Sequence, residues 1–67
     1  MMKVDSARVR DLLFQRGLSI REFAAQSGLN ELTAAKVIRD GATVSTKVVG
    51  ALAKFFNVDG NSLILKD

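Results

Sequence analysis

The side chains that could carry out chemistry in this chain of 67 residues are seven carboxylates and ten lysines and arginines. The sequence contains no histidine and no cysteine, which removes the commonest general base, disulfides and thiolate metal sites. No two carboxylates have a spacing that would place them on one helix face as an acid and base pair. We therefore expect a protein that is not an enzyme and that holds no metal and no cofactor. The carboxylates are Asp5, Asp11, Glu22, Glu31, Asp40, Asp59 and Asp67.

The charge of the chain favours a polyanionic partner. The formal net charge is +3 at pH 7 and the sequence pI is near 9.8, which gives a mild attraction to nucleic acid. The longest apolar run, residues 48–56, contains a glycine and a lysine and is about half the roughly 20 residues needed to span a bilayer. The first five residues lack the apolar core of a signal peptide. We expect a cytoplasmic protein that has no contact with a membrane.

The elements that must position these side chains are predicted to be helices. The sequence is 48% apolar, has no proline, and repeats its apolar positions at intervals of three and four residues. We therefore predict a compact all-α fold with five helices in a single domain that spans residues 1–67. At this size, one core gives a modest stability, on the order of 3 to 5 kcal/mol.

Two helix starts around one glycine are the strongest local signal. Ser19 can cap a helix whose third residue, Glu22, reaches back to the Ser19 amide, and Gly28 can adopt the left-handed conformation that ends this helix. Asn30 can then cap the next helix, predicted from Glu31 to about Arg39, where Asp40 and Gly41 end it. Two helices joined by so short a turn cross steeply, as in a helix-turn-helix, and the second can enter a DNA major groove.

The remaining helices are predicted from caps and apolar stripes. The first starts at Asp5 or Ser6, buries Ala7, Val9, Leu12 and Leu13, and stops at Gly17. The fourth has Ser45 as its cap, spans residues 46–56 and ends at Asn57, after a crossing segment at 42–44. Asp59 caps a short fifth helix that contains Leu63 and could include Ile64. Several apolar residues exceed what one helix needs, and we expect a dimer interface to include them: Val49, Phe55, Leu63, Ile64 and Leu65. Phe55 and Leu63 could equally pack within the monomer.

In order and spacing, these motifs resemble the lambda-repressor-like (XRE-type) family of bacterial and phage regulators, to which Cro-type proteins belong. The resemblance covers residues 9–64. It implies a five-helix domain that binds operator DNA, usually as a dimer, with its third helix in the major groove. The matching pieces are Leu18-Ser19, Glu22-Phe23-Ala24, Gly28-Leu29-Asn30, Gly41, Val44-Ser45 and residues 51–58.

The sequence departs from the family pattern at three places, all of which affect DNA contacts more than folding. Ile20 stands where many members have a glutamine that touches a phosphate. The interval from Gly28 to Gly41 is one residue longer than the commonest spacing. The glutamate usually found near the end of the third helix is replaced by Ile38 or Arg39.

The resemblance also implies which residues meet DNA. We expect base edges to be read by Asn30, Glu31, Leu32, Thr33 and Lys36. We expect phosphates to be bound by Arg21, Arg39, Thr43, Ser45 and Lys47. Two of these have simpler interpretations, since Asn30 could be only a helix cap and Leu32 could be buried. The arginines of the first helix, namely Arg8, Arg10 and Arg16, are interpreted as contributing to solubility.

The expected function is that of a sequence-specific transcriptional regulator of double-stranded DNA, most simply a repressor. A homodimer would place two recognition helices about 34 Å apart on an inverted repeat. The alternative is a protein-interaction module or antitoxin-like partner that uses the same helical fold. No small-molecule ligand is inferred.

Overall fold

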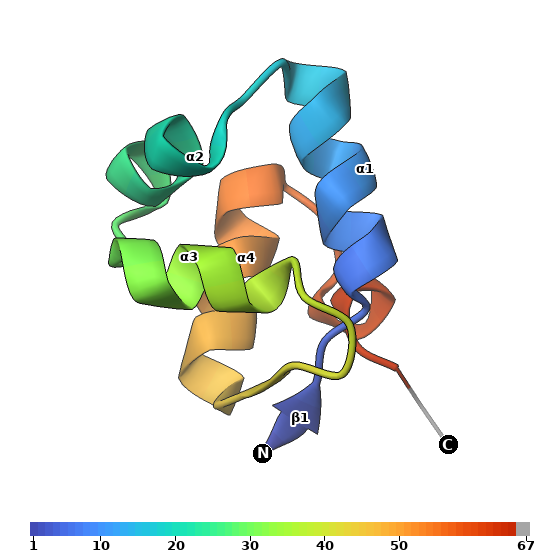
Figure 1. The fold of residues 1–67 in the computed structure, drawn as a ribbon. Coiled ribbons are helices and arrows are strands. Elements are labelled where there is room, and N and C mark those ends of the chain that lie inside the picture. The colour runs from blue at the N-terminus through green and yellow to red at the C-terminus, as the bar shows by residue number, and fades with distance from the viewer. Residues whose placement is uncertain (66–67) are drawn as a thin grey trace.

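The computed structural model describes residues 1–65 of the chain, and over this range the protein is mainly helical (Figure 1). The α-helices are α1 (Ser6–Arg16), α2 (Ile20–Ser27), α3 (Glu31–Val37) and α4 (Thr46–Phe56). Two short strands, β1 (Met2–Lys3) and β2 (Thr43–Val44), and a 3-10 helix, η1 (Gly60–Leu63), complete the described elements. The prediction of an all-α fold therefore holds for the four helices and is wrong for the small sheet.

The predicted caps explain where the helices begin and end. The Glu22 N–H donates to Ser19 Oγ at 3.1 Å, and the Ser19 N–H donates to Glu22 Oε1 at 3.0 Å, which completes the capping box of α2. Gly28 ends α2 in the left-handed conformation, with φ of 79°. Asp5, rather than Ser6, caps α1, because its side chain accepts from the Arg8 N–H at 3.2 Å. Asn57 ends α4 in the left-handed conformation.

The third helix is shorter than predicted, since α3 ends at Val37 and not near Arg39. The Arg39 N–H donates to the Lys36 carbonyl at 3.0 Å. This i to i−3 bond is the pattern of a 3-10 turn and replaces the i to i−4 bond of a continuing α-helix. In a continuing helix the Ile38 carbonyl would accept from Ala42. It accepts instead from Nη1 of Arg10 at 2.6 Å, a donor on α1 that local sequence does not reveal.

The fifth helical segment is also shorter than predicted. It is the four-residue 3-10 helix η1, capped by Asp59, and it ends at Leu63. Ile64 is extended and forms a β-bridge to Val4, so its possible inclusion in a helix is wrong.

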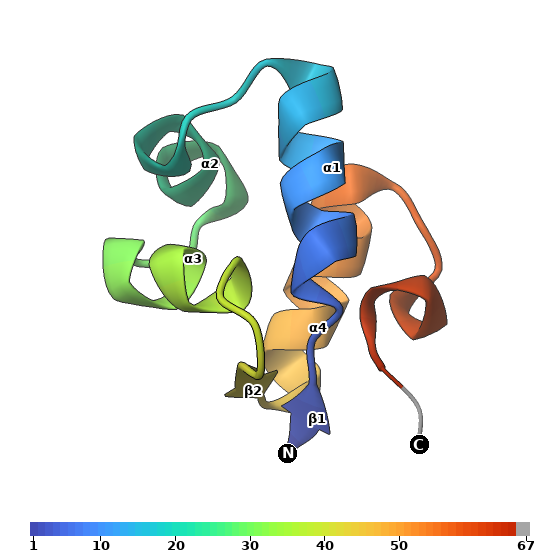
Figure 2. The same cartoon turned by 45° about the vertical axis from the view of Figure 1, so that its right-hand side comes forward.

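The N-terminal strand joins two distant parts of the chain (Figure 2). It pairs antiparallel with β2, where Met2 is opposite Val44 and Lys3 is opposite Thr43. On its other side, the Leu65 N–H donates to the Lys3 carbonyl at 2.8 Å. Sequence periodicity could not predict strands of two residues, because alternation becomes visible only over about four to eight residues.

The core lies around α4, with α1, α2 and α3 arranged about it (Figures 1 and 2). Phe23 of α2 is fully buried, and its ring centroid lies 5.6 Å from those of both Phe55 and Phe56. Aromatic pairs at this separation stabilise a core beyond their buried area. The other large residues that are fully buried are Leu52, Leu63, Val4, Val9 and Val37.

Two predictions about burial need correction. Ala7 is exposed, and Ser6 takes the buried position in the first turn of α1, while Val9, Leu12 and Leu13 are buried as predicted. Of the apolar residues considered for a dimer interface, Val49 and Leu63 are buried within the monomer and cannot serve a partner. Phe55 and Ile64 are half-buried against the core, and Leu65 is 48% exposed.

Candidate functional site

The candidate site is built on α2, α3 and the three residues that join them (Figure 1). Gly28 turns the chain sharply, and Leu29 packs half-buried against the core. The Leu29 N–H donates to Ser27 Oγ at 3.3 Å, which further holds the turn. Phe23 and Ala24 of α2 and Ala34 and Val37 of α3 are all buried. The two helices therefore pack against the same core, and the orientation of α3 is set by buried contacts.

The outward face of α3 carries Leu32 and Lys36, which are four residues apart and so lie one above the other. Ala34 and Val37 are on the opposite face and are fully buried. Leu32 is 82% exposed, so the interpretation of this residue as a core residue is wrong. Lys36 is exposed and Thr33 is half-buried at the edge of this face. The structure thus presents an apolar group and a cation side by side to solvent.

The first residues of α3 have partners within the protein. Asn30 Oδ1 accepts from the Thr33 N–H at 2.7 Å, so Asn30 caps the helix as predicted. Glu31 Oε1 lies 3.8 Å from Nε of Arg21, and both side chains are largely exposed. Exposed pairs at this distance contribute little to stability. The pair nevertheless brings together a residue expected to read bases and a residue expected to bind phosphate.

The remaining residues expected at phosphates follow α3. Arg39 and Lys36 line one shallow, open hollow of about 260 Å³ beyond the end of this helix, together with Asp40, Gly41 and Ala42. Thr43 is half-buried in β2. Ser45 Oγ accepts from the Val48 N–H at 3.4 Å and so caps α4, and Lys47 is exposed in the first turn of that helix. The structure therefore brings Lys36 and Arg39 together, while Arg21 lies at the other end of α3.

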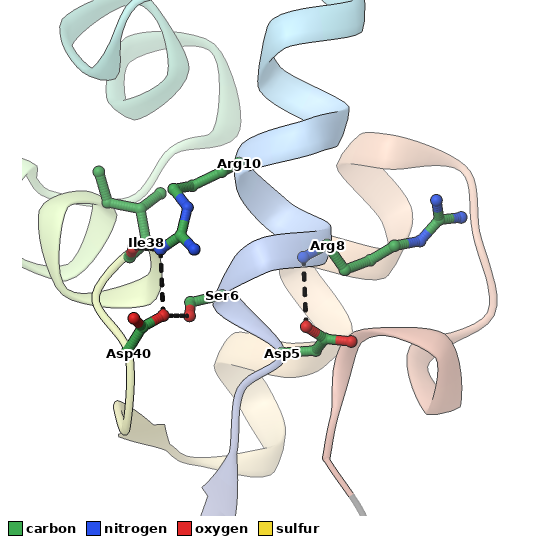
Figure 3. A network of polar contacts seen from close by, with 6 residues as sticks. All are labelled: Asp5, Ser6, Arg8, Arg10, Ile38 and Asp40. Atoms are coloured by element: carbon green, nitrogen blue, oxygen red, sulfur yellow. Dashed lines mark hydrogen bonds and ion pairs between the residues drawn. The ribbon is translucent and has the colours of Figure 1, made fainter.

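Three residues that the sequence did not assign to the site, Ser6, Arg10 and Asp40, form a polar network next to the end of α3 (Figure 3). Asp40 Oδ1 accepts from Ser6 Oγ at 2.8 Å and from Nη1 of Arg10 at 3.2 Å. The hydrogen bond from Ser6, followed by the hydrogen bond and charge of Arg10, lowers the pKa of Asp40. The partners are 30 or more residues apart in sequence, so no local signal could have identified them.

Two of the first-helix arginines, interpreted from the sequence as contributing to solubility, also make hydrogen bonds within the protein. Arg10 belongs to the network around Asp40, where it also binds the Ile38 carbonyl. Arg16 donates to the carbonyls of Phe55 and Phe56 at the end of α4. Both guanidinium groups therefore connect α1 to the ends of other helices, and they place α1 behind the candidate site as a support.

The described residues hold neither a membrane-spanning helix nor a cluster of metal ligands. Residues 1–65 contain no helix long and apolar enough to cross a bilayer. Within the same range, no three acidic side chains are placed to share a metal ion.

Comparison with known proteins agrees with this geometry. A family model described as helix-turn-helix matches residues 8–63, which is most of the chain. Comparisons with curated proteins and with solved structures gave no significant match. The matched range runs from α1 through η1 and so includes the turn at Gly28, the outward face of α3 and the helices that support them. The chain therefore belongs to the lambda-repressor-like helix-turn-helix family.

Proposed function

We propose that this protein is a sequence-specific transcriptional regulator that binds double-stranded DNA, most simply as a repressor that occupies an operator. In this proposal residues 1–67 act as one domain, α2 and α3 form the helix-turn-helix unit, and α3 enters the major groove. Membership of the helix-turn-helix family supports DNA binding, and the positive net charge is in keeping with a polyanionic partner.

The observation that carries the proposal is the outward face of α3. Leu32 and Lys36 are exposed on it, while Ala34 and Val37 hold the opposite face in the core. A leucine can contact the methyl group of thymine, and a lysine can donate to O6 or N7 of guanine. Because both side chains project from a helix whose inner face is packed, they need no rearrangement of the backbone to reach base edges.

The edges of this face supply further contacts with bases. Thr33 can donate to or accept from a base edge, and Glu31 can accept from N4 of cytosine. Glu31 is also a negative charge close to DNA, so it would weaken binding wherever no cytosine is present to donate. Asn30 keeps its side-chain amino group for a base while its oxygen caps α3.

Phosphate contacts are proposed on both sides of α3. Arg21 lies near its start, and Arg39 lines the hollow beyond its end. Further along the chain, the start of α4 offers backbone N–H groups and an exposed cation. Anions are favoured at the N-terminus of a helix, so this end of α4 can hold a phosphate. Its proposed ligands are Thr43, Ser45 and Lys47.

We also propose that the protein acts as a homodimer on an inverted repeat, with half-sites separated by about 34 Å. The partly exposed Phe55, Ile64 and Leu65 are the members of the predicted apolar set that remain available to a partner. Light scattering with and without operator checks this directly. A mass that stays at the 7.3 kDa of one chain at high concentration, and a complex with one chain per duplex, would contradict the dimer.

The experiment that tests DNA binding is selection of bound duplexes from a random pool, followed by band shifts on the selected and a scrambled duplex. We expect the selection to yield an inverted repeat, and we expect the scrambled duplex to bind far more weakly at equal salt. An NMR titration with the selected duplex should shift amide resonances of residues 30–39. Resonances that stay unmoved in this segment, with shifts only elsewhere, would overturn the assignment of α3 as the recognition helix.

A further inference from the structure

We propose that Ser6, Arg10 and Asp40 form a latch that positions the segment after α3, residues 38–42, and with it the hollow between Lys36 and Arg39. In this inference the three latch residues are positioning residues and do not themselves touch DNA. It rests on the proposed DNA-binding function, because Arg39 at this hollow is taken to bind a phosphate of the DNA backbone.

Two atoms of the latch, Oδ1 of Asp40 and Nη1 of Arg10, each take part in two hydrogen bonds (Figure 3). One carboxylate oxygen of Asp40 accepts from both Ser6 Oγ at 2.8 Å and Nη1 of Arg10 at 3.2 Å. The same nitrogen of Arg10 donates to the Ile38 carbonyl at 2.6 Å. The latch thus ties α1 to two points of segment 38–42, one through the backbone and one through a side chain.

The segment depends on such a tie because it has left the helix. After Val37 the Arg39 N–H donates to the Lys36 carbonyl and the Ala42 N–H donates to the Arg39 carbonyl, at 3.0 and 3.2 Å. The backbone of this segment is tied to a distant element at its last residue, where the Ala42 carbonyl accepts from the Val4 N–H at 2.9 Å. Residues 39–41 are all exposed, so packing does not hold them. By contrast, Ser6 is 4% exposed in the first turn of α1, and it offers a rigid anchor.

The position of Asp40 is informative because its charge is unfavourable for the proposed ligand. Asp40 lines the same hollow as Lys36 and Arg39, where a carboxylate repels a phosphate. If the charge of Asp40 were its only effect, removing the side chain would strengthen DNA binding. If Asp40 positions the segment, removing it weakens binding. The two interpretations therefore differ in the sign of the effect.

The first test compares Asp40→Ala with Asp11→Ala on the selected duplex. Both variants remove one negative charge. Asp11 is exposed on α1 and accepts only a hydrogen bond from Gln15 of the same helix, at 2.9 Å. We expect Asp40→Ala to bind roughly three- to tenfold more weakly than wild type, and Asp11→Ala to bind equally or slightly more tightly. Unchanged or tighter binding by Asp40→Ala would overturn the latch.

The second test uses Ser6→Ala, which changes no charge. Its control is Ser62→Ala, since Ser62 Oγ also makes one hydrogen bond, to the Asp59 carbonyl at 2.6 Å, but lies in η1. We expect Ser6→Ala to weaken binding roughly two- to tenfold, with an unchanged dependence on salt, because no phosphate contact is removed. Binding equal to that of wild type, or a lower salt dependence, would contradict a positioning role.

A measurement on the free protein separates failure of the latch from failure of the proposed function. In Ser6→Ala without DNA, amide resonances of residues 38–42 should shift, while those of α2 should not. Resonances of 38–42 that stay in place overturn the latch, whether or not the protein binds DNA. Wild type that fails to retain any duplex overturns the proposed function, and the resonance shifts then still report on the latch itself.

Discussion

Arg16 and Phe56 join the last turn of α1 to the last turn of α4. Nη2 of Arg16 donates to the Phe56 carbonyl at 2.9 Å, and Nη1 donates to the Phe55 carbonyl at 3.0 Å. The guanidinium carbon also lies 5.3 Å from the centroid of the Phe56 ring and 5.4 Å from that of Phe55. One side chain therefore satisfies two C-terminal carbonyls of α4 and covers the aromatic core.

This contact predicts that Arg16→Ala lowers the free energy of unfolding by about 1 to 2 kcal/mol, because two hydrogen bonds and a cation–π contact are lost. The free energy of unfolding of Arg16→Lys should lie between those of wild type and Arg16→Ala, since lysine keeps the charge but not the planar pair of donors. Urea unfolding measures the effect. The control is Arg21→Ala, whose side chain is 90% exposed and should change stability by less than about 0.5 kcal/mol. Equal losses in the two alanine variants would contradict the role of Arg16.

Two glycines should respond oppositely to alanine. Gly50 is exposed in the middle of α4, and a Cβ added there meets no atom within 4 Å. Gly50→Ala should therefore raise the free energy of unfolding by about 0.5 to 1 kcal/mol through helix propensity. Gly28→Ala should lower it by about 1 kcal/mol or more, because φ of 79° strains any L side chain. Thermal melts of both variants check the pair, and a stabilised Gly28→Ala protein would contradict the left-handed turn.

The capping box of α2 predicts a loss of stability in acid. The hydrogen bond from the Ser19 N–H, and then that from the Ser19 side chain, lower the pKa of Glu22 below its ordinary value of 4.5. A carboxylate with a lowered folded pKa contributes stability above the unfolded value. This contribution is lost as the pH falls through the unfolded value toward the folded one.

Thermal melts of wild type and Glu22→Gln, from neutral pH to about pH 3, measure this contribution. The difference in melting temperature between them should shrink below about pH 4.5, because glutamine does not titrate. Asp40 also has a lowered pKa and acts in the same direction in both proteins, so it cancels in the difference. A difference that stays constant with pH would contradict the prediction.

Base reading and phosphate binding predict different behaviour for two lysines. Lys36→Ala should cost roughly 1 to 3 kcal/mol on the selected duplex and relax the preference at one base pair. Lys47→Ala should weaken binding to all sequences alike and reduce the salt slope by about one. Band shifts on selected and scrambled duplexes at several salt concentrations distinguish them. If Lys36→Ala lost affinity equally for both duplexes, Lys36 would be assigned to phosphate instead.

The predictions from sequence were most successful where a structure is stabilised within a few residues. The capping box joins Ser19 and Glu22, the cap of α3 joins Asn30 and Thr33, and both form between residues three apart. Such bonds depend on local residue types, so the starts of α2, α3 and α4 could be predicted. The burial of Phe23, Ala34 and Val37 could also be predicted, since the helical period places them on inner faces.

The errors arose where a distant partner sets the local structure. The end of α3 is determined with the help of Arg10 on α1, which binds the Ile38 carbonyl. The hydroxyl of the buried Ser6 donates to Asp40, 34 residues away. For the candidate site, residue types indicated which side chains could meet DNA. Local patterns could not show that Leu32 is exposed or that Lys36 and Arg39 share a hollow.

By itself, the sequence determined the presence of four α-helices, the caps that begin α2, α3 and α4, the family and the lack of histidine and cysteine, because each of these depends on residue types or on their short spacing. Only the tertiary structure decided the pairing of β1 with β2, the last residue of α3 and the network that joins Ser6, Arg10 and Asp40. Strands of two residues and hydrogen bonds across 28 or more residues form only when the core has brought their partners together.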